Sequence, residues 1–120
     1  MKADSVTQTK SKAFAIRIVR LFQFLTEKKK EFVLSKQILR SGTSIGANIV
    51  EAKYAISKKE FVLKPQIALK EAAETAFWLE LLHETNYLTH CEFSGIHADC
   101  EEILRLLTSS LTTLKNQVPA

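Results

Sequence analysis

The sequence predicts an all-α fold, an antiparallel up-down-up-down four-helix bundle that spans residues 1–120 as a single domain. Three observations support this prediction. Apolar residues recur at every third or fourth position, which is the period of an amphipathic helix. Only three glycines and two prolines interrupt the 120 residues, whereas a β domain needs a turn about every 8–12 residues. Apolar residues make up 46% of the chain, enough for one core at this length.

The first half of the chain contains two predicted helices. One is expected over residues 9–28, with Phe14 and Ile18 on its apolar face. The other is expected over residues 34–55, with an apolar face that continues to Ile56. Short connections between successive helices make neighbours antiparallel. The two ends of the chain are predicted to be flexible, namely residues 1–8 and 117–120.

Two capping boxes mark the starts of the third and fourth helices. In each box a hydroxyl accepts a hydrogen bond from the backbone N–H three residues later, and a glutamate there bonds back. Ser57 with Glu60 forms the first box and Thr89 with Glu92 the second. Pro65 is expected to bend the third helix rather than end it. Apolar pairs occupy the staple positions of the two boxes: Ile56 with Phe61, and Leu88 with Phe93.

Two glycines lie inside the second predicted helix, at positions 42 and 46. Each costs about 1 kcal/mol relative to alanine in a helix, so residues 41–47 could instead form a loop. The apolar period continues on both sides, which favours a helix in which the glycines allow close packing of a neighbour. Gly42 to Gly46 also match the G-x-S-x-G pattern of hydrolases, but the strand which that motif requires is missing.

Two groups of residues resemble metal sites but have unsuitable spacing. Glu80 and His83 form one Glu-x-x-His unit, and a di-metal bundle needs a second. Cys91 and Cys100 are nine residues apart, so in one helix they would lie on opposite faces; His90 and His97 would be about 10 Å apart. We therefore expect no catalytic residue, cofactor or metal site, and a protein that is not an enzyme.

The charge is unevenly distributed along the chain. Residues 1–64 carry 14 Lys and Arg against 5 Asp and Glu, a balance of +9, and residues 65–120 carry 3 against 8, a balance of −5. The basic half could pair with the acidic half, or it could form a binding surface for a polyanion. No signal peptide or membrane-spanning stretch is apparent, which predicts a cytoplasmic protein without membrane contact.

The stretch over residues 39–52, with Ser44, Asn48 and Glu51 at its centre, resembles the signature of the four helix bundle protein family. Residues 57–61 and 68–75 are also similar to that family. Its members are often encoded in intervening sequences of bacterial large-subunit ribosomal RNA genes. The resemblance implies an all-α bundle that forms homo-oligomers, notably ring-like pentamers. A related accessory protein of retroelements resembles a basic barrel that binds nucleic acid and a reverse transcriptase.

The family supplies no catalytic residues. Its signature positions suggest a structural role, in which Ser44 and Asn48, four residues apart, would form a hydrogen-bonded network with Glu74 across the bundle. Glu51 is also assigned to this network, and Glu60 is the remaining signature position. A buried polar network must be fully satisfied, and it then specifies one arrangement of helices.

Two functions remain open from the sequence. The first is a homo-oligomer that binds RNA or DNA, most simply RNA, through phosphate contacts. The second is a structural or adapter protein that binds only protein. The expected nucleic-acid contacts are Arg17, Arg20, Lys28, Lys29, Lys30, Lys36, Arg40, Lys53, Lys58, Lys59 and Lys64. The expected oligomer contacts are apolar residues that one core cannot accommodate: Ile16, Val19, Phe24, Phe77 and Trp78.

Overall fold

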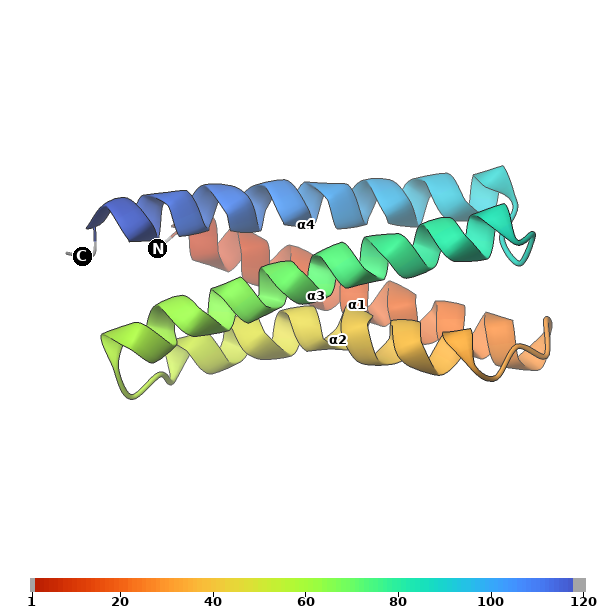
Figure 1. The fold of residues 1–120 in the computed structure, drawn as a ribbon, viewed down its shortest axis with the longest axis horizontal. Coiled ribbons are helices and arrows are strands. Elements are labelled where there is room, and N and C mark those ends of the chain that lie inside the picture. The colour runs from red at the N-terminus through yellow and green to blue at the C-terminus, as the bar shows by residue number, and fades with distance from the viewer. Residues whose placement is uncertain (1, 118–120) are drawn as a thin grey trace.

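Four antiparallel helices form an elongated bundle of 49 × 23 × 22 Å (Figure 1). The computed structural model describes residues 2–117 of the chain. Each helix packs against two neighbours, in the closed order α1–α2–α3–α4–α1. The predicted all-α bundle is confirmed. The helices are α1 (Lys2–Glu27), α2 (Leu34–Lys53), α3 (Lys58–Glu84) and α4 (His90–Gln117).

The ends of the helices differ in part from the expected ones. Helix α1 already begins at Lys2, so residues 2–8, expected to be a flexible end, are helical. Residues 118–120, also expected to be flexible, lie outside the described residues. Helix α2 ends at Lys53, which leaves Ile56 in the connection to α3.

The second capping box is complete, whereas the first is half formed. Thr89 Oγ1 accepts a hydrogen bond from the Glu92 N–H at 3.2 Å, and Glu92 Oε1 accepts one from the Thr89 N–H at 2.8 Å. Ser57 Oγ accepts from the Glu60 N–H at 3.1 Å, without a return bond from the Glu60 side chain. The staple expected at Ile56 is wrong, because this side chain is 92% exposed.

Helix α2 begins at a cap that the sequence patterns missed. The buried carboxylate of Glu31 accepts hydrogen bonds from three successive backbone N–H groups, those of Val33, Leu34 and Ser35, at 3.3, 3.1 and 2.7 Å. The Ser35 hydroxyl donates to the Glu31 carbonyl at 2.9 Å. Burial alone would raise the pKa of the Glu31 carboxyl, but the N–H donors outweigh it and lower the pKa. Glu31 therefore satisfies the free end of α2 as a carboxylate.

The replacement Glu31→Gln is expected to lower the free energy of unfolding by about 1 kcal/mol at neutral pH. Because the folded state has the lower pKa, the carboxylate's contribution is complete above the unfolded pKa of about 4.3. It is lost as the pH falls through the folded pKa. Urea unfolding at about pH 7 and about pH 2.5 measures the effect. The difference in free energy of unfolding between wild type and Glu31→Gln should be smaller at about pH 2.5 than at about pH 7. An equal difference at both pH values would contradict the role of the charge.

Residues 41–47 are helical, as the apolar period predicted. The side of α2 that carries Gly42 lies directly against α1. A Cβ atom at Gly42 would lie 2.7 Å from Ile18 Cγ1 and 2.8 Å from its Cγ2. A Cβ atom at Gly46 would lie 3.6 Å from the Ser11 carbonyl oxygen, an ordinary contact. The two glycines therefore lie under different packing constraints.

The core consists of the predicted apolar stripes. Its fully buried members include Phe14, Ile18, Leu25, Ile38, Ile45, Leu79, Leu82, Ile103 and Leu107. Pro65 lies inside α3 without ending it. Phe61, the second member of the first predicted staple, is also exposed, in the first turn of α3 beside the connection from α2. One core thus holds four helices, and the sites of interest lie on its surface.

Candidate nucleic-acid interface

Three of the eleven basic residues expected to contact nucleic acid are bound to acidic side chains. Arg17 on α1 pairs with Asp99 on α4. Arg40 on α2 pairs with Glu71, at 3.1 Å, and with Glu74, both on α3. Lys64 on α3 pairs with Glu51 on α2 at 3.0 Å. Lys10, which was not among the expected contacts, likewise pairs with Glu102 at 3.2 Å.

These ion pairs connect neighbouring helices around the bundle. They show that part of the basic half of the sequence pairs with acidic residues, as one of the two interpretations of the charge asymmetry expected. Exposed ion pairs contribute little stability, about 0–1 kcal/mol each. A paired cation is nevertheless less available to a phosphate, because the phosphate must displace its carboxylate.

The other eight expected contacts have no acidic partner among the described residues. They are exposed, and they group mainly toward the two ends of the bundle. At one end, Lys28, Lys29 and Lys30 follow the last turn of α1, and Lys36 lies in the first turn of α2. We call these four the loop lysines. The remaining members are Arg20, on α1, and Lys53, Lys58 and Lys59, near the α2–α3 connection.

The loop lysines also have a structural role at the end of α1. Cations near a helix C-terminus interact favourably with its dipole, and Lys29 Nζ lies 5.8 Å from the centroid of the Phe24 ring. Lys30 has a positive φ of 56°, which reverses the chain before α2. These roles leave the ammonium groups accessible to solvent.

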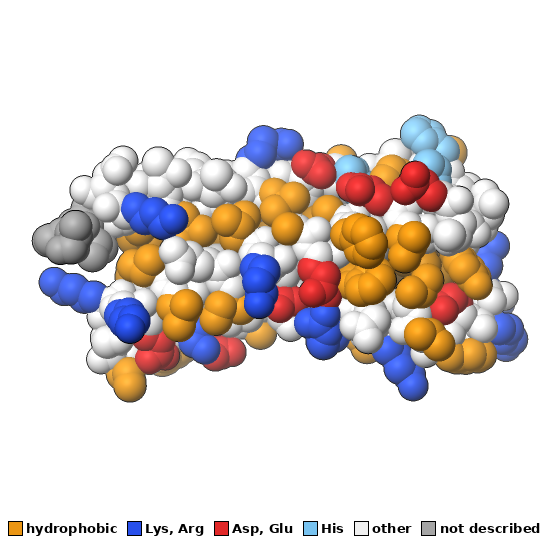
Figure 2. Space-filling model, viewed as in Figure 1, with side chains coloured by type: hydrophobic (Ala, Val, Ile, Leu, Met, Phe, Trp, Pro, Cys, Tyr) orange, Lys and Arg blue, Asp and Glu red, His pale blue; other side chains and the backbone are white. Residues whose placement is uncertain are grey.

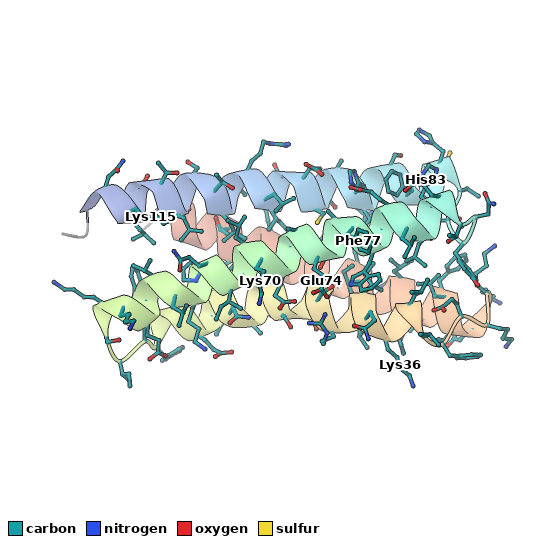
Figure 3. The ribbon with its side chains drawn as sticks, viewed as in Figure 1. Lys36, Lys70, Glu74, Phe77, His83 and Lys115 are labelled. Carbon is teal, nitrogen blue, oxygen red and sulfur yellow. The ribbon has the colours of Figure 1, made fainter. Side chains whose placement is uncertain are left out.

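A basic group at the opposite end includes one residue that the sequence patterns missed. Lys58, Lys59 and Lys115 line the same shallow surface hollow. Figure 3 shows Lys115 and Lys36 toward opposite ends of the bundle. Lys115 lies in the acidic half of the sequence, and only the antiparallel packing of α3 and α4 brings it beside the start of α3.

The polar network expected from the signature residues differs from the one observed. The Asn48 side chain donates to the Ser44 carbonyl at 2.8 Å, and the Ser44 hydroxyl donates to the Arg40 carbonyl at 2.6 Å. Both bonds stay within α2. Glu74 accepts from Arg40 and from Trp78 Nε1, so its expected bond to Asn48 or Ser44 is wrong.

A buried hydroxyl pair makes the polar contact between α2 and α3 instead. Thr75 Oγ1 lies 2.9 Å from Ser41 Oγ and 2.7 Å from the Glu71 carbonyl oxygen. Since Thr75 has one hydroxyl proton and the carbonyl can only accept, Thr75 donates to Glu71 and Ser41 donates to Thr75. Glu51 also connects α2 with α3, through its ion pair to Lys64.

The five residues expected at an oligomer interface fall into two groups. Ile16, Val19 and Phe77 are 50%, 40% and 55% exposed. Phe24 and Trp78 are half-buried and pack against the core, and the Trp78 ring meets that of Phe77 edge-on at 5.2 Å. Figure 2 shows hydrophobic side chains gathered on one face of the bundle, toward the end that holds the α1–α2 and α3–α4 loops.

The two cysteines lie in different environments. Cys91 is exposed and Cys100 is buried. Burial, together with the negative charges of Glu101, Glu80 and Asp99, raises the pKa of the Cys100 thiol to about 12. The thiol donates to the Ala72 carbonyl at 3.3 Å. Cys100 is thus a core residue with an unreactive thiol.

The structure brings together three potential metal ligands that were not grouped by sequence spacing. Glu80 on α3 faces His97 and Glu101 on α4. Spacing along one helix relates only His97 to Glu101, four residues apart. Glu80 joins them because α3 and α4 are antiparallel neighbours, a relation that the short α3–α4 connection could have suggested.

These features define the class of protein: it is a bundle of four antiparallel helices whose basic surface is partly ion-paired. No helix within residues 2–117 is long and apolar enough to cross a bilayer. Residues 3–109 match the family model of the 23S rRNA-intervening sequence protein, and the chain belongs to that family.

One solved structure is closely similar to this chain. It is a protein of unknown function from the S23 ribosomal protein family of Bacteroides thetaiotaomicron VPI-5482. The two are 55% identical with a TM-score of 0.90, over 92% of this chain and 98% of that chain. No curated protein matches the chain.

Proposed function

We propose that this protein is a non-enzymatic homo-oligomeric bundle that binds RNA through cations with no acidic partner. The observation that carries the proposal is the division of the basic residues into two sets. Of the eleven expected contacts, eight are exposed cations without an acidic partner among the described residues, while Arg17, Arg40 and Lys64 form ion pairs between neighbouring helices. The name of the family associates its genes with 23S ribosomal RNA sequences, which makes RNA the first ligand to test.

The chemistry of the surface favours backbone contacts over base readout. Lysine ammonium groups act as point charges on phosphate, and the loop lysines are exposed at the end of the bundle where α1 connects to α2. Phosphate contacts position a protein on nucleic acid without reading its sequence. Specificity for RNA would then come from its shape and from the repetition of the site.

Assembly would strengthen such a weak site. In a ring, such as a pentamer, each cluster of lysines recurs in every subunit, and linked sites bind one polyanion with much higher avidity than one site alone. The exposed Ile16, Val19 and Phe77 supply apolar surface for subunit contacts. The proposal places the protein in the bacterial cytoplasm, where its RNA ligand is found.

Binding to a structured RNA hairpin is expected to weaken steeply with salt. If at least four phosphates are contacted, each contributing about 0.7 to the slope, the logarithm of the binding constant should fall with a slope of about −3 or steeper. Fluorescence anisotropy at several salt concentrations measures it. Duplex DNA of equal length is the comparison that reports a preference for RNA. A flat salt dependence, or no binding at low salt, would overturn the proposal.

The exposed apolar residues favour a second candidate, an adapter that assembles by protein contacts alone. Static light scattering of the chain with and without the hairpin separates the two functions. An oligomer whose mass is unchanged by RNA, together with no binding in the salt titration, would establish the adapter function.

A further inference from the structure

A histidine and two glutamates converge on the surface between α3 and α4. His97 Nε2 lies 2.9 Å from Glu80 Oε2 and 3.5 Å from Glu101 Oε1. One potential ligand atom from each residue lies within 4.8 Å of the other two. The side chains of His97, Glu80 and Glu101 are 22%, 48% and 42% exposed, so an ion can reach them from solvent. Figure 2 shows histidine and acidic side chains together along this edge.

Packing holds the imidazole in its orientation. The His97 ring stacks on Phe93, with centroids 4.6 Å apart and planes at 25°. The Phe93 ring also stacks on the ring of His83, with centroids 4.3 Å apart and planes at 11°. The Nε2 atom thus faces the carboxylates before any ion binds, which lowers the ordering cost of binding.

Within the protein, His97 forms a close hydrogen bond with only one of the two glutamates. His97 Nε2 carries at most one proton, so it can donate one good hydrogen bond, to Glu80 at 2.9 Å. Glu101, at 3.5 Å, lies too far for a second strong one. Two carboxylates then share one imidazole, and the group keeps a net negative charge whether the ring is neutral or protonated. A divalent cation would neutralise both carboxylates at once and use the Nε2 lone pair.

We propose that Glu80, His97 and Glu101 form a binding site for a divalent transition-metal ion of the zinc class. Such an ion accepts one nitrogen and two carboxylate oxygens at about 2.0–2.2 Å, which places ligand atoms about 3–3.5 Å apart. The two separations from His97 Nε2, 2.9 and 3.5 Å, are close to this, and the two carboxylate oxygens lie within 4.8 Å of each other. An imidazole ligand favours zinc, cobalt or nickel over magnesium and calcium. Water would complete the coordination, and the ion would connect α3 with α4. This site is independent of the RNA surface.

Zinc titration of the full chain, after treatment with a chelator, tests the proposal. We expect one ion per chain by isothermal titration calorimetry and a rise in Tm on adding zinc, with no comparable rise from magnesium. Glu80→Gln and Glu101→Gln should each weaken binding by about tenfold or more. His97→Ala should abolish it. Melting in the presence of chelator checks that each variant is folded.

Three matched replacements outside the cluster serve as controls. His90→Ala and Cys91→Ser remove two exposed groups with affinity for zinc at the start of α4, and Glu84→Gln removes an exposed carboxylate of α3. All three should bind zinc like the wild type. No stoichiometric binding by the wild type would overturn the proposal. So would binding that survives in His97→Ala but is lost in Cys91→Ser, or a magnesium effect equal to that of zinc.

Discussion

Replacing Gly42 by alanine is expected to lower the free energy of unfolding by about 2 kcal/mol, close to a 30-fold change in the folded-to-unfolded ratio. The new Cβ would lie 2.7 Å from Ile18 Cγ1, and Ile18 is fully buried. The β-branched side chain cannot rotate away, so α1 and α2 must separate. Overpacking of this kind costs up to about 3 kcal/mol, and the higher helix propensity of alanine returns about 1 kcal/mol.

Gly46→Ala is the matched control, with the same chemical change one turn further along the same helix. Its Cβ would meet the Ser11 carbonyl oxygen at 3.6 Å, an ordinary contact. The gain in helix propensity should therefore dominate and raise the free energy of unfolding by about 0.5–1 kcal/mol. Urea unfolding of both variants measures the pair. Equal effects of the two replacements would contradict close packing at Gly42 as the cause.

The features that local rules describe could be predicted from the sequence. The four helices follow from the apolar period, and the α4 start follows from the Thr89 and Glu92 box because both of its partners lie within one turn. The glycines at 42 and 46 were correctly placed inside a helix for the same reason. Their different packing could not be predicted, since it depends on where Ile18 and Ser11 of α1 lie.

Some local features were also missed. Glu31 caps α2 through the N–H groups of Val33, Leu34 and Ser35, but glutamate is not one of the residues that usually cap a helix start, which are Ser, Thr, Asp and Asn. The network expected to join Ser44 and Asn48 to Glu74 was wrong, because both side chains donate hydrogen bonds to backbone carbonyls of their own helix. Ile56 continued an apolar stripe in the sequence, but α2 ends at Lys53 before reaching it.

The same limit applies to the charged residues. Composition showed a basic half and an acidic half, but it could not show which cations are neutralised. Arg17, Arg40 and Lys64 form ion pairs with carboxylates on neighbouring helices, whereas the loop lysines have no acidic partner within residues 2–117. Glu80 and His97 likewise meet only because two helices are neighbours. Antiparallel pairing, rather than spacing along the chain, decides the chemistry of this surface.

The central claim is that only the unpaired cations contact RNA. Two variants that each remove four positive charges test it under identical conditions. The first replaces the loop lysines, as Lys28→Gln, Lys29→Gln, Lys30→Gln and Lys36→Gln. The second replaces four paired cations, as Lys10→Gln, Arg17→Gln, Arg40→Gln and Lys64→Gln. Both place a polar, uncharged side chain at each position, and thermal melting checks that both are folded.

The deciding measurement is the affinity of each variant for the same RNA hairpin at one moderate salt concentration. Loss of the loop lysines should weaken binding on the order of 100-fold and reduce the salt slope by about 3. Loss of the paired cations should change the affinity by no more than about threefold, since they make no phosphate contact and the carboxylates left without a partner are screened by salt beyond about 10 Å. Equal losses in both variants, or a greater loss in the second, would contradict the account.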